Sequence, residues 1–179
     1  MAYSYSGPAP AYEPWPVSSD TGAPALRAEI LSAVFLFVAG ACGIVQLFVP
    51  WVSSPDVGSP TGWQSFQALK QILPAVGFSY TFAAYAIFAV VVVGVAFLAI
   101  GAAMLFPIDH RPPGIVAAFG ALVAVACAVW WAFWGPNGGV SSAFSHGSVG
   151  WYLFLATGVL GAVGSIRAIV AGGPQQTSL

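Results

Sequence analysis

The side chains that most often carry out chemistry are few in this chain and are widely separated. The densest polar cluster is Asp109, His110 and Arg111, a carboxylate, an imidazole and a guanidinium that together could perform acid–base catalysis. The other histidine, His146, lies in a segment rich in Ser and Gly. A long apolar stretch separates the two histidines, so we expect them on opposite faces of a membrane, where they cannot share a site.

Cys42 and Cys127 lie inside long apolar stretches and have no neighbouring His or carboxylate to complete a metal site. A buried free cysteine behaves as a small apolar packing residue. The sequence also has no phosphate-binding glycine loop followed by Lys and Ser or Thr. We therefore predict no catalytic residue, no metal ligand and no cofactor, and we predict that the chain is not an enzyme. A membrane enzyme that uses His110 or Asp109 is the remaining catalytic alternative.

The polar residues and cysteines described above lie within or between four long apolar stretches. None of these stretches has an ionisable side chain at its centre. Each is close to the ~20 residues that a helix needs to cross a ~30 Å hydrocarbon core. The whole chain is 59% hydrophobic and 5% charged, whereas soluble domains contain about 25% charged residues. The sequence thus predicts an all-α fold, an integral membrane four-helix bundle over residues 29–171. The expected spans are 30–51, 78–106, 113–134 and 149–170.

Composition also limits the partners. The net charge is −1 and no basic stretch is present, which excludes nucleic acid. A single lysine among many Ala, Gly and Val residues is typical of GC-rich bacterial genes, so we expect a bacterial plasma membrane. Ionisable groups at mid-membrane depth usually mark ion and proton paths, and their absence from the centres of the stretches argues against such transport.

The cationic residues and the tryptophans predict one orientation. Arg27, Arg111 and Arg167 would share one side and Lys70 would lie on the other, which places both termini in the cytoplasm by the positive-inside rule. All tryptophans except Trp15 then gather at the outer interface, where an amphipathic indole is most stable.

Residues 1–28 form a separate, proline-rich cytoplasmic tail that we expect to be extended. It is either a disordered leader or an arm that docks on a partner. The aromatic residues that motivate the docking arm are Tyr3, Tyr5, Tyr12 and Trp15. Residues 172–179 form a short cytoplasmic tail at the other terminus. Between the third and fourth spans, residues 135–150 are rich in Gly and Ser and predict a flexible loop.

A short amphipathic helix is expected on the outer side, over residues 62–73. Thr61 and Gln64 have the spacing of a capping box, and Pro74 ends the helix. The apolar face consists of Trp63, Phe66, Leu69 and Leu73. The helix either seals the top of the bundle or presents a ledge to a partner, in which case its two aromatic residues are candidate partner-binding residues.

Close helix contacts are expected where small residues recur at short spacing. Gly158, Gly161 and Gly164 in the last span are the best candidates for such a contact, either within the bundle or with another subunit. The polar exception in the first span is Gln46, whose buried amide should bond a neighbouring backbone or side chain or, alternatively, a ligand headgroup.

The proline- and tyrosine-rich leader, four spans, outer amphipathic helix and tryptophan-rich outer belt resemble small four-span accessory proteins of actinobacterial membranes. Some of these are associated with the respiratory supercomplex of cytochrome bcc and cytochrome aa3 oxidase. The resemblance covers the layout of the whole chain. It implies a cofactor-free subunit that binds the lipid-facing surface of larger integral membrane subunits.

We therefore expect a non-catalytic accessory or assembly subunit of a larger bacterial membrane complex. Its partners would be larger integral membrane subunits and lipid, and no small-molecule substrate is expected. The alternative is a small transporter or channel for a neutral or lipidic molecule, which would need no charged groups and could use the aromatic residues at the outer mouth. A continuous cavity between the spans would favour the alternative.

Overall fold

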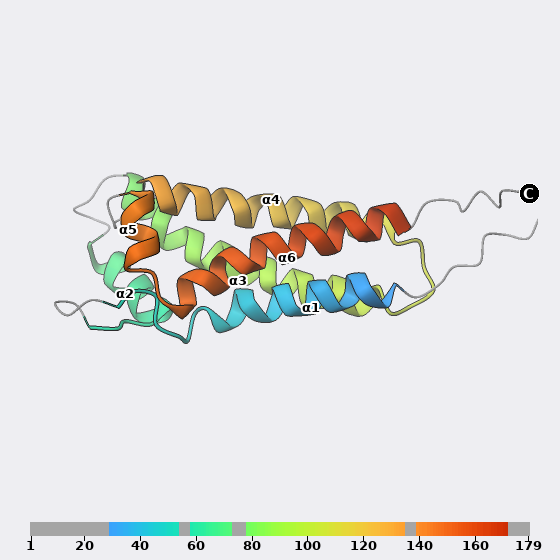
Figure 1. The fold of residues 1–179 in the computed structure, drawn as a ribbon, viewed down its shortest axis with the longest axis horizontal. Coiled ribbons are helices and arrows are strands. Elements are labelled where there is room, and N and C mark those ends of the chain that lie inside the picture. The colour runs from blue at the N-terminus through green and yellow to red at the C-terminus, as the bar shows by residue number, and fades with distance from the viewer. Residues whose placement is uncertain (1–28, 54–57, 73–77, 135–138, 172–179) are drawn as a thin grey trace, which may run out of the picture.

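The computed structural model describes residues 29–53, 58–72, 78–134 and 139–171, and within these ranges the chain is all-helical (Figure 1). The helices are α1 (Ile30–Val45), α2 (Gly62–Ile72), α3 (Phe78–Ala103), α4 (Arg111–Trp134), α5 (Val140–Ser145) and α6 (Val149–Ala171). The only β-type pairings among the described residues are two isolated bridges. The predicted all-α class is therefore confirmed for the part of the chain that the structure describes.

The four long helices form an elongated bundle in which each helix is antiparallel to its two neighbours (Figure 1). Helix α1 packs against α3 and α6, and α4 packs against the same two helices on the other side. Helix α1 begins and α6 ends at one end of the bundle, which we call the terminal end. Helices α2 and α5 lie at the opposite end, the α2/α5 end.

Within the described ranges, three helical segments are long and apolar enough to cross a membrane: Thr81–Ala103 within α3, Arg111–Trp134, which is α4, and Val149–Ala171, which is α6. Helix α1 is equally apolar but has 16 residues, or about 24 Å at a rise of ~1.5 Å per residue. It is the shortest of the four bundle helices.

The helices differ from the expected spans mainly at their ends. The first helix ends at Val45 rather than at residue 51, because Leu47 and Phe48 donate backbone hydrogen bonds three residues back and Pro50 cannot continue a helix. Helix α3 ends at Ala103 rather than at residue 106, shortly before Pro107. The other two helices are longer than the expected spans. Helix α4 begins at Arg111 rather than at residue 113, so that its prolines occupy the first turn, and α6 extends to Ala171 rather than to residue 170.

At the α2/α5 end, one expected feature is present and one element was not expected. Helix α2 covers Gly62–Ile72, and its capping box is confirmed: the Thr61 N–H donates to Gln64 Oε1 at 3.0 Å and the Gln64 N–H donates to Thr61 Oγ1 at 3.3 Å. The segment expected to be a flexible loop instead contains the six-residue helix α5. The first turn of α5 is closed by the Ala143 N–H, which donates to the Gly139 carbonyl at 3.0 Å.

Helices α1 and α3 approach each other through glycine. A Cβ atom at Gly40 would lie 2.7 Å from the Gly94 carbonyl oxygen, and one at Gly94 would lie 2.9 Å from the Gly40 carbonyl oxygen. No larger residue fits at either position without separating the helices. Such direct backbone contact is the usual way in which helices associate tightly where water supplies no driving force.

Candidate binding surfaces

A buried cluster of aromatic rings fills the bundle near the α2/α5 end. Trp51 lies at its centre, with its ring centroid 5.1 Å from that of Trp131, 6.3 Å from that of Trp151 and 5.0 Å from that of Phe154. We call these four residues the aromatic cluster. Trp51 and Trp151 are each 2% exposed. The edge-to-face geometry of Trp51 with its neighbours is the arrangement that aromatic quadrupoles favour.

Gln46 and Trp51 hold the start of this region by hydrogen bonds. The Trp51 indole Nε1–H donates to the Gln46 backbone carbonyl at 2.8 Å. The fully buried Gln46 amide nitrogen donates to the carbonyls of Gly43 and Ile87 at 3.3 and 3.4 Å, which confirms the expected bonding to neighbouring backbone. The last bond joins the end of α1 to α3, so the amide that directly follows this apolar helix links two helices.

Three segments distant in sequence are joined by backbone hydrogen bonds across the α2/α5 end. The Trp51 N–H donates to the Pro60 carbonyl at 2.9 Å, while the Trp51 carbonyl accepts from the Ser148 N–H at 2.9 Å. The Gly150 N–H donates to the Pro50 carbonyl at 2.8 Å. The chain after α1 is thus joined by backbone hydrogen bonds to the start of α2 and to the start of α6.

An exposed row of aromatic rings runs from α2 to α3. The Trp63 and Phe66 ring centroids are 5.7 Å apart, and those of Phe66 and Phe88 are 5.4 Å apart. Trp63 is 42% and Phe88 43% exposed, while Phe66 is half-buried between them. We call these three residues the aromatic row. It brings together both predicted partner-binding residues of α2 and adds Phe88, which we did not predict.

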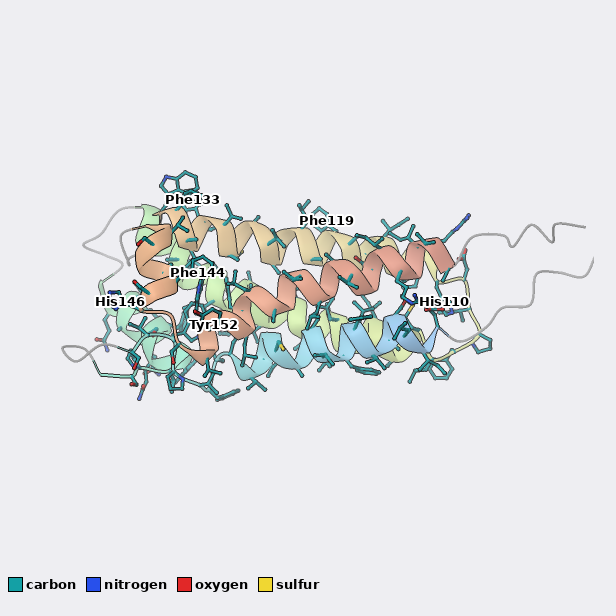
Figure 2. All side chains as sticks on the ribbon, in the orientation of Figure 1. His110, Phe119, Phe133, Phe144, His146 and Tyr152 are labelled. Carbon is teal, nitrogen blue, oxygen red and sulfur yellow. The ribbon has the colours of Figure 1, made fainter. Side chains whose placement is uncertain are left out.

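A second apolar surface lies at the same end, between α4, α5 and α6. It is a groove with a volume of about 230 Å³, lined almost entirely by apolar atoms. Its lining includes Val129 and Phe133 of α4, Phe144 of α5, and Trp151, Leu155 and Val159 of α6. Figure 2 shows Phe133, Phe144 and Tyr152 around this end of the bundle. We call it the α4/α5/α6 groove.

The glycines of α6 that we singled out lie inside the bundle. A Cβ atom at Gly158 would lie 2.8 Å from a Val125 methyl carbon, and one at Gly161 would lie 2.5 Å from Phe97 Cζ. At Gly164 it would lie 3.1 Å from Leu36 Cγ. The three positions therefore contact α4, α3 and α1 in turn, which corresponds to the within-bundle alternative.

The polar residues that could perform chemistry are spread over both ends. His110 lies at the terminal end and His146 at the α2/α5 end (Figure 2). His110 is only 4% exposed. Asp109 accepts the Arg111 backbone N–H at 3.0 Å, an ordinary helix-start contact. Among the described residues, no group of three or more His, Cys, Asp or Glu side chains could hold a metal ion.

One ion pair joins the first and last helices at the terminal end. Arg167 Nε lies 3.0 Å from Glu29 Oε1, and the Glu29 backbone N–H donates to the Met104 carbonyl at 3.0 Å. Glu29 thus contacts both α6 and the end of α3. The Arg167 side chain is 49% exposed and the Glu29 side chain 19% exposed. Water and salt therefore partly screen the attraction between the two charges.

The predicted docking residues of the tail, Tyr3, Tyr5, Tyr12 and Trp15, lie outside the described residues. Comparisons with protein-family models, with curated proteins and with solved structures found no match. The functional assignment therefore depends on the surfaces described above.

Proposed function

We propose that this chain is a four-span protein of a bacterial plasma membrane and that it acts as a non-catalytic accessory or assembly subunit of a larger membrane complex. The single observation that carries the proposal is the aromatic row. Trp63, Phe66 and Phe88 form a continuous apolar surface from the amphipathic helix α2 to α3, which is long and apolar enough to cross a membrane. Large aromatic side chains dominate the energetics of protein interfaces.

The packing of α1 supports a fourth span. Helix α1 lies between α3 and α6 along the bundle, and both of these helices contain segments long enough to cross a membrane. A helix that packs along α3 and α6 at the same depth would share their hydrocarbon surroundings. Residues 46–51 follow α1 and lead to Trp51 in the aromatic cluster, so the mostly apolar segment that begins with α1 is longer than the helix itself.

The distribution of charge supports a cytoplasmic terminal end. Arg111 begins α4 and Arg167 lies near the end of α6, so both are at the end of the bundle where α1 begins. Lys70 lies on α2 at the opposite end. This asymmetry follows the positive-inside rule and favours both termini in the cytoplasm.

Core packing and a backbone hydrogen bond hold α2 in place, which makes it suitable as a docking platform. Leu69 is 8% exposed and belongs to the buried core, while the Trp63 N–H donates to the Leu47 carbonyl at 2.8 Å. The polar face of α2, with Gln64, Gln67 and Lys70, remains exposed. Because α2 is already held in place, this chain loses little conformational entropy when a partner binds the aromatic row.

The proposed partners are larger integral membrane subunits. The resemblance to small actinobacterial accessory proteins makes a respiratory supercomplex the first complex to test. The test is affinity purification of the tagged chain from its native membrane in mild detergent, followed by mass spectrometry and an absorption spectrum. Stoichiometric larger subunits with haem absorbance are expected; a colourless, partner-free protein from the same membranes would contradict the proposal.

The α4/α5/α6 groove favours a second candidate function, the handling of a lipidic molecule. A transporter of lipid would move a fluorescent phospholipid between the leaflets of proteoliposomes faster than protein-free vesicles do. An accessory subunit would leave that rate unchanged. The assay therefore separates the two candidates without knowledge of the partner.

A further inference from the structure

The α4/α5/α6 groove lies along two helices that are long enough to cross a membrane. On α4 it runs from Val125 to Phe133, which spans about 12 Å at a rise of ~1.5 Å per residue. A single leaflet supplies about 15 Å of the ~30 Å hydrocarbon core. The groove therefore extends over most of the depth of one leaflet, beginning at the α2/α5 end.

The groove is continuous with the exposed apolar surface of the bundle. Val129 is 46%, Phe133 58% and Val159 59% exposed, and all three line the groove. In the proposed membrane placement, these side chains face lipid tails, so the groove opens sideways into hydrocarbon. This continuity identifies the molecule that meets the groove: an acyl chain of the surrounding bilayer.

Helix α5 contributes one wall of the groove through Val140 and Phe144. Phe144 lies with its ring centroid 6.1 Å from that of Trp151, and the Tyr152 hydroxyl donates to the Phe144 carbonyl at 3.4 Å. These contacts hold Phe144 against the start of α6. The described residues begin at Glu29 and end at Ala171, both at the terminal end of the bundle (Figure 1). Neither of these points lies near the groove.

We propose that the α4/α5/α6 groove holds one acyl chain of a phospholipid from the leaflet at the α2/α5 end. The inference rests on the proposed membrane placement but not on the proposed accessory role. A volume of about 230 Å³ lies below the ~300–1,000 Å³ of sites that enclose whole drug-sized ligands. It suits part of one chain, with the headgroup left outside near α5.

The test is native mass spectrometry of the full chain. The protein is reconstituted in vesicles of palmitoyl-oleoyl phosphatidylethanolamine and phosphatidylglycerol and is then transferred to mild detergent. The wild type should retain one phospholipid per chain. Val129→Phe, which fills the groove from α4, should lower the retained fraction at least about fivefold. Val116→Phe is the matched control, since Val116 is 60% exposed on the same helix and does not line the groove.

A second variant, Val159→Phe, fills the groove from α6 and should have the same effect as Val129→Phe. Circular dichroism verifies that each variant keeps its helices, and at least one folded groove variant is required for the comparison. Equal lipid retention in a folded groove variant and in the wild type would overturn the proposal. A lipid-free wild type or a lipid-free dimer would overturn it as well.

Two further measurements separate this inference from the proposed function. Resistance of the chain to alkaline carbonate extraction tests the membrane placement by itself. Recovery of partner subunits tests the accessory role. A membrane-integrated wild type that retains no lipid would refute the groove proposal alone, whereas retained lipid without partners would refute the accessory role alone.

Discussion

Trp51 and Trp151 lie in the same aromatic cluster, with ring centroids 6.3 Å apart and equal exposure of 2%, but they differ in hydrogen bonding. The Trp51 indole N–H donates to the Gln46 carbonyl at 2.8 Å. The Trp151 indole nitrogen has no acceptor among the described residues. A comparison of the two tryptophans therefore measures how much one buried hydrogen bond contributes to the stability of an apolar bundle.

We predict that Trp51→Phe destabilises the bundle more than Trp151→Phe does. Both changes remove similar volume, but only the first leaves the buried Gln46 carbonyl without its donor, which costs about 1–3 kcal/mol. The free energy of unfolding in mixed detergent micelles measures the difference. Equal losses in the two variants would show that the Trp51 bond contributes nothing.

The contact between Gly161 and Phe97 yields a second prediction. A side chain at Gly161 would overlap the Phe97 ring, so Gly161→Leu should prevent assembly of the bundle. Val163→Leu introduces the same residue on the exposed face of α6 and should be tolerated. In Gly161→Leu with Phe97→Ala, the space from the lost ring should restore part of the stability. A monodisperse, thermally stable Gly161→Leu single variant would contradict the packing.

The ion pair of Glu29 and Arg167 should contribute little. For a partly exposed pair, screening limits the contribution to about 1 kcal/mol or less. We expect Arg167→Gln to lower the melting temperature slightly and this difference to disappear near ~1 M salt. Arg111→Gln, at another exposed arginine of the same end, is the control. A large, salt-independent loss would mean that the pair holds the end of the bundle together.

The proposed orientation predicts the accessibility of the two ends. In a background with Cys42→Ala and Cys127→Ala, His146→Cys should react with a membrane-impermeant maleimide in intact cells. Ile108→Cys, at the 40% exposed turn between α3 and α4, should react only after the membrane is permeabilised. The reverse pattern would place the termini outside.

Local sequence signals predicted part of this structure well. The capping box of Thr61 and Gln64 and the helical spacing of Trp63, Phe66 and Leu69 involve only neighbouring residues, and α2 begins at Gly62 as expected. The sequence did not decide whether the glycines of α6 contact the bundle or another subunit, because the spacing of small residues indicates a close helix contact but not which helix makes it.

Features formed by segments distant in sequence were not predicted. The pairing of Pro50 with Thr61 and with Gly150, which follows the early end of α1, is not revealed by a single apolar stretch. Phe88 joins the aromatic row only because α2 folds against α3. The groove requires α4, the unexpected helix α5 and α6 together.

Photo-crosslinking from the aromatic row in the native membrane tests the proposed accessory role at the surface that carries it. A photoreactive phenylalanine analogue replaces Phe66, and the same analogue at Phe119, which is 68% exposed on α4, serves as the control. We predict that position 66 forms a covalent adduct with one larger integral membrane subunit and that position 119 captures lipid only. If both positions capture only lipid, the aromatic row is not a partner surface and the account is wrong.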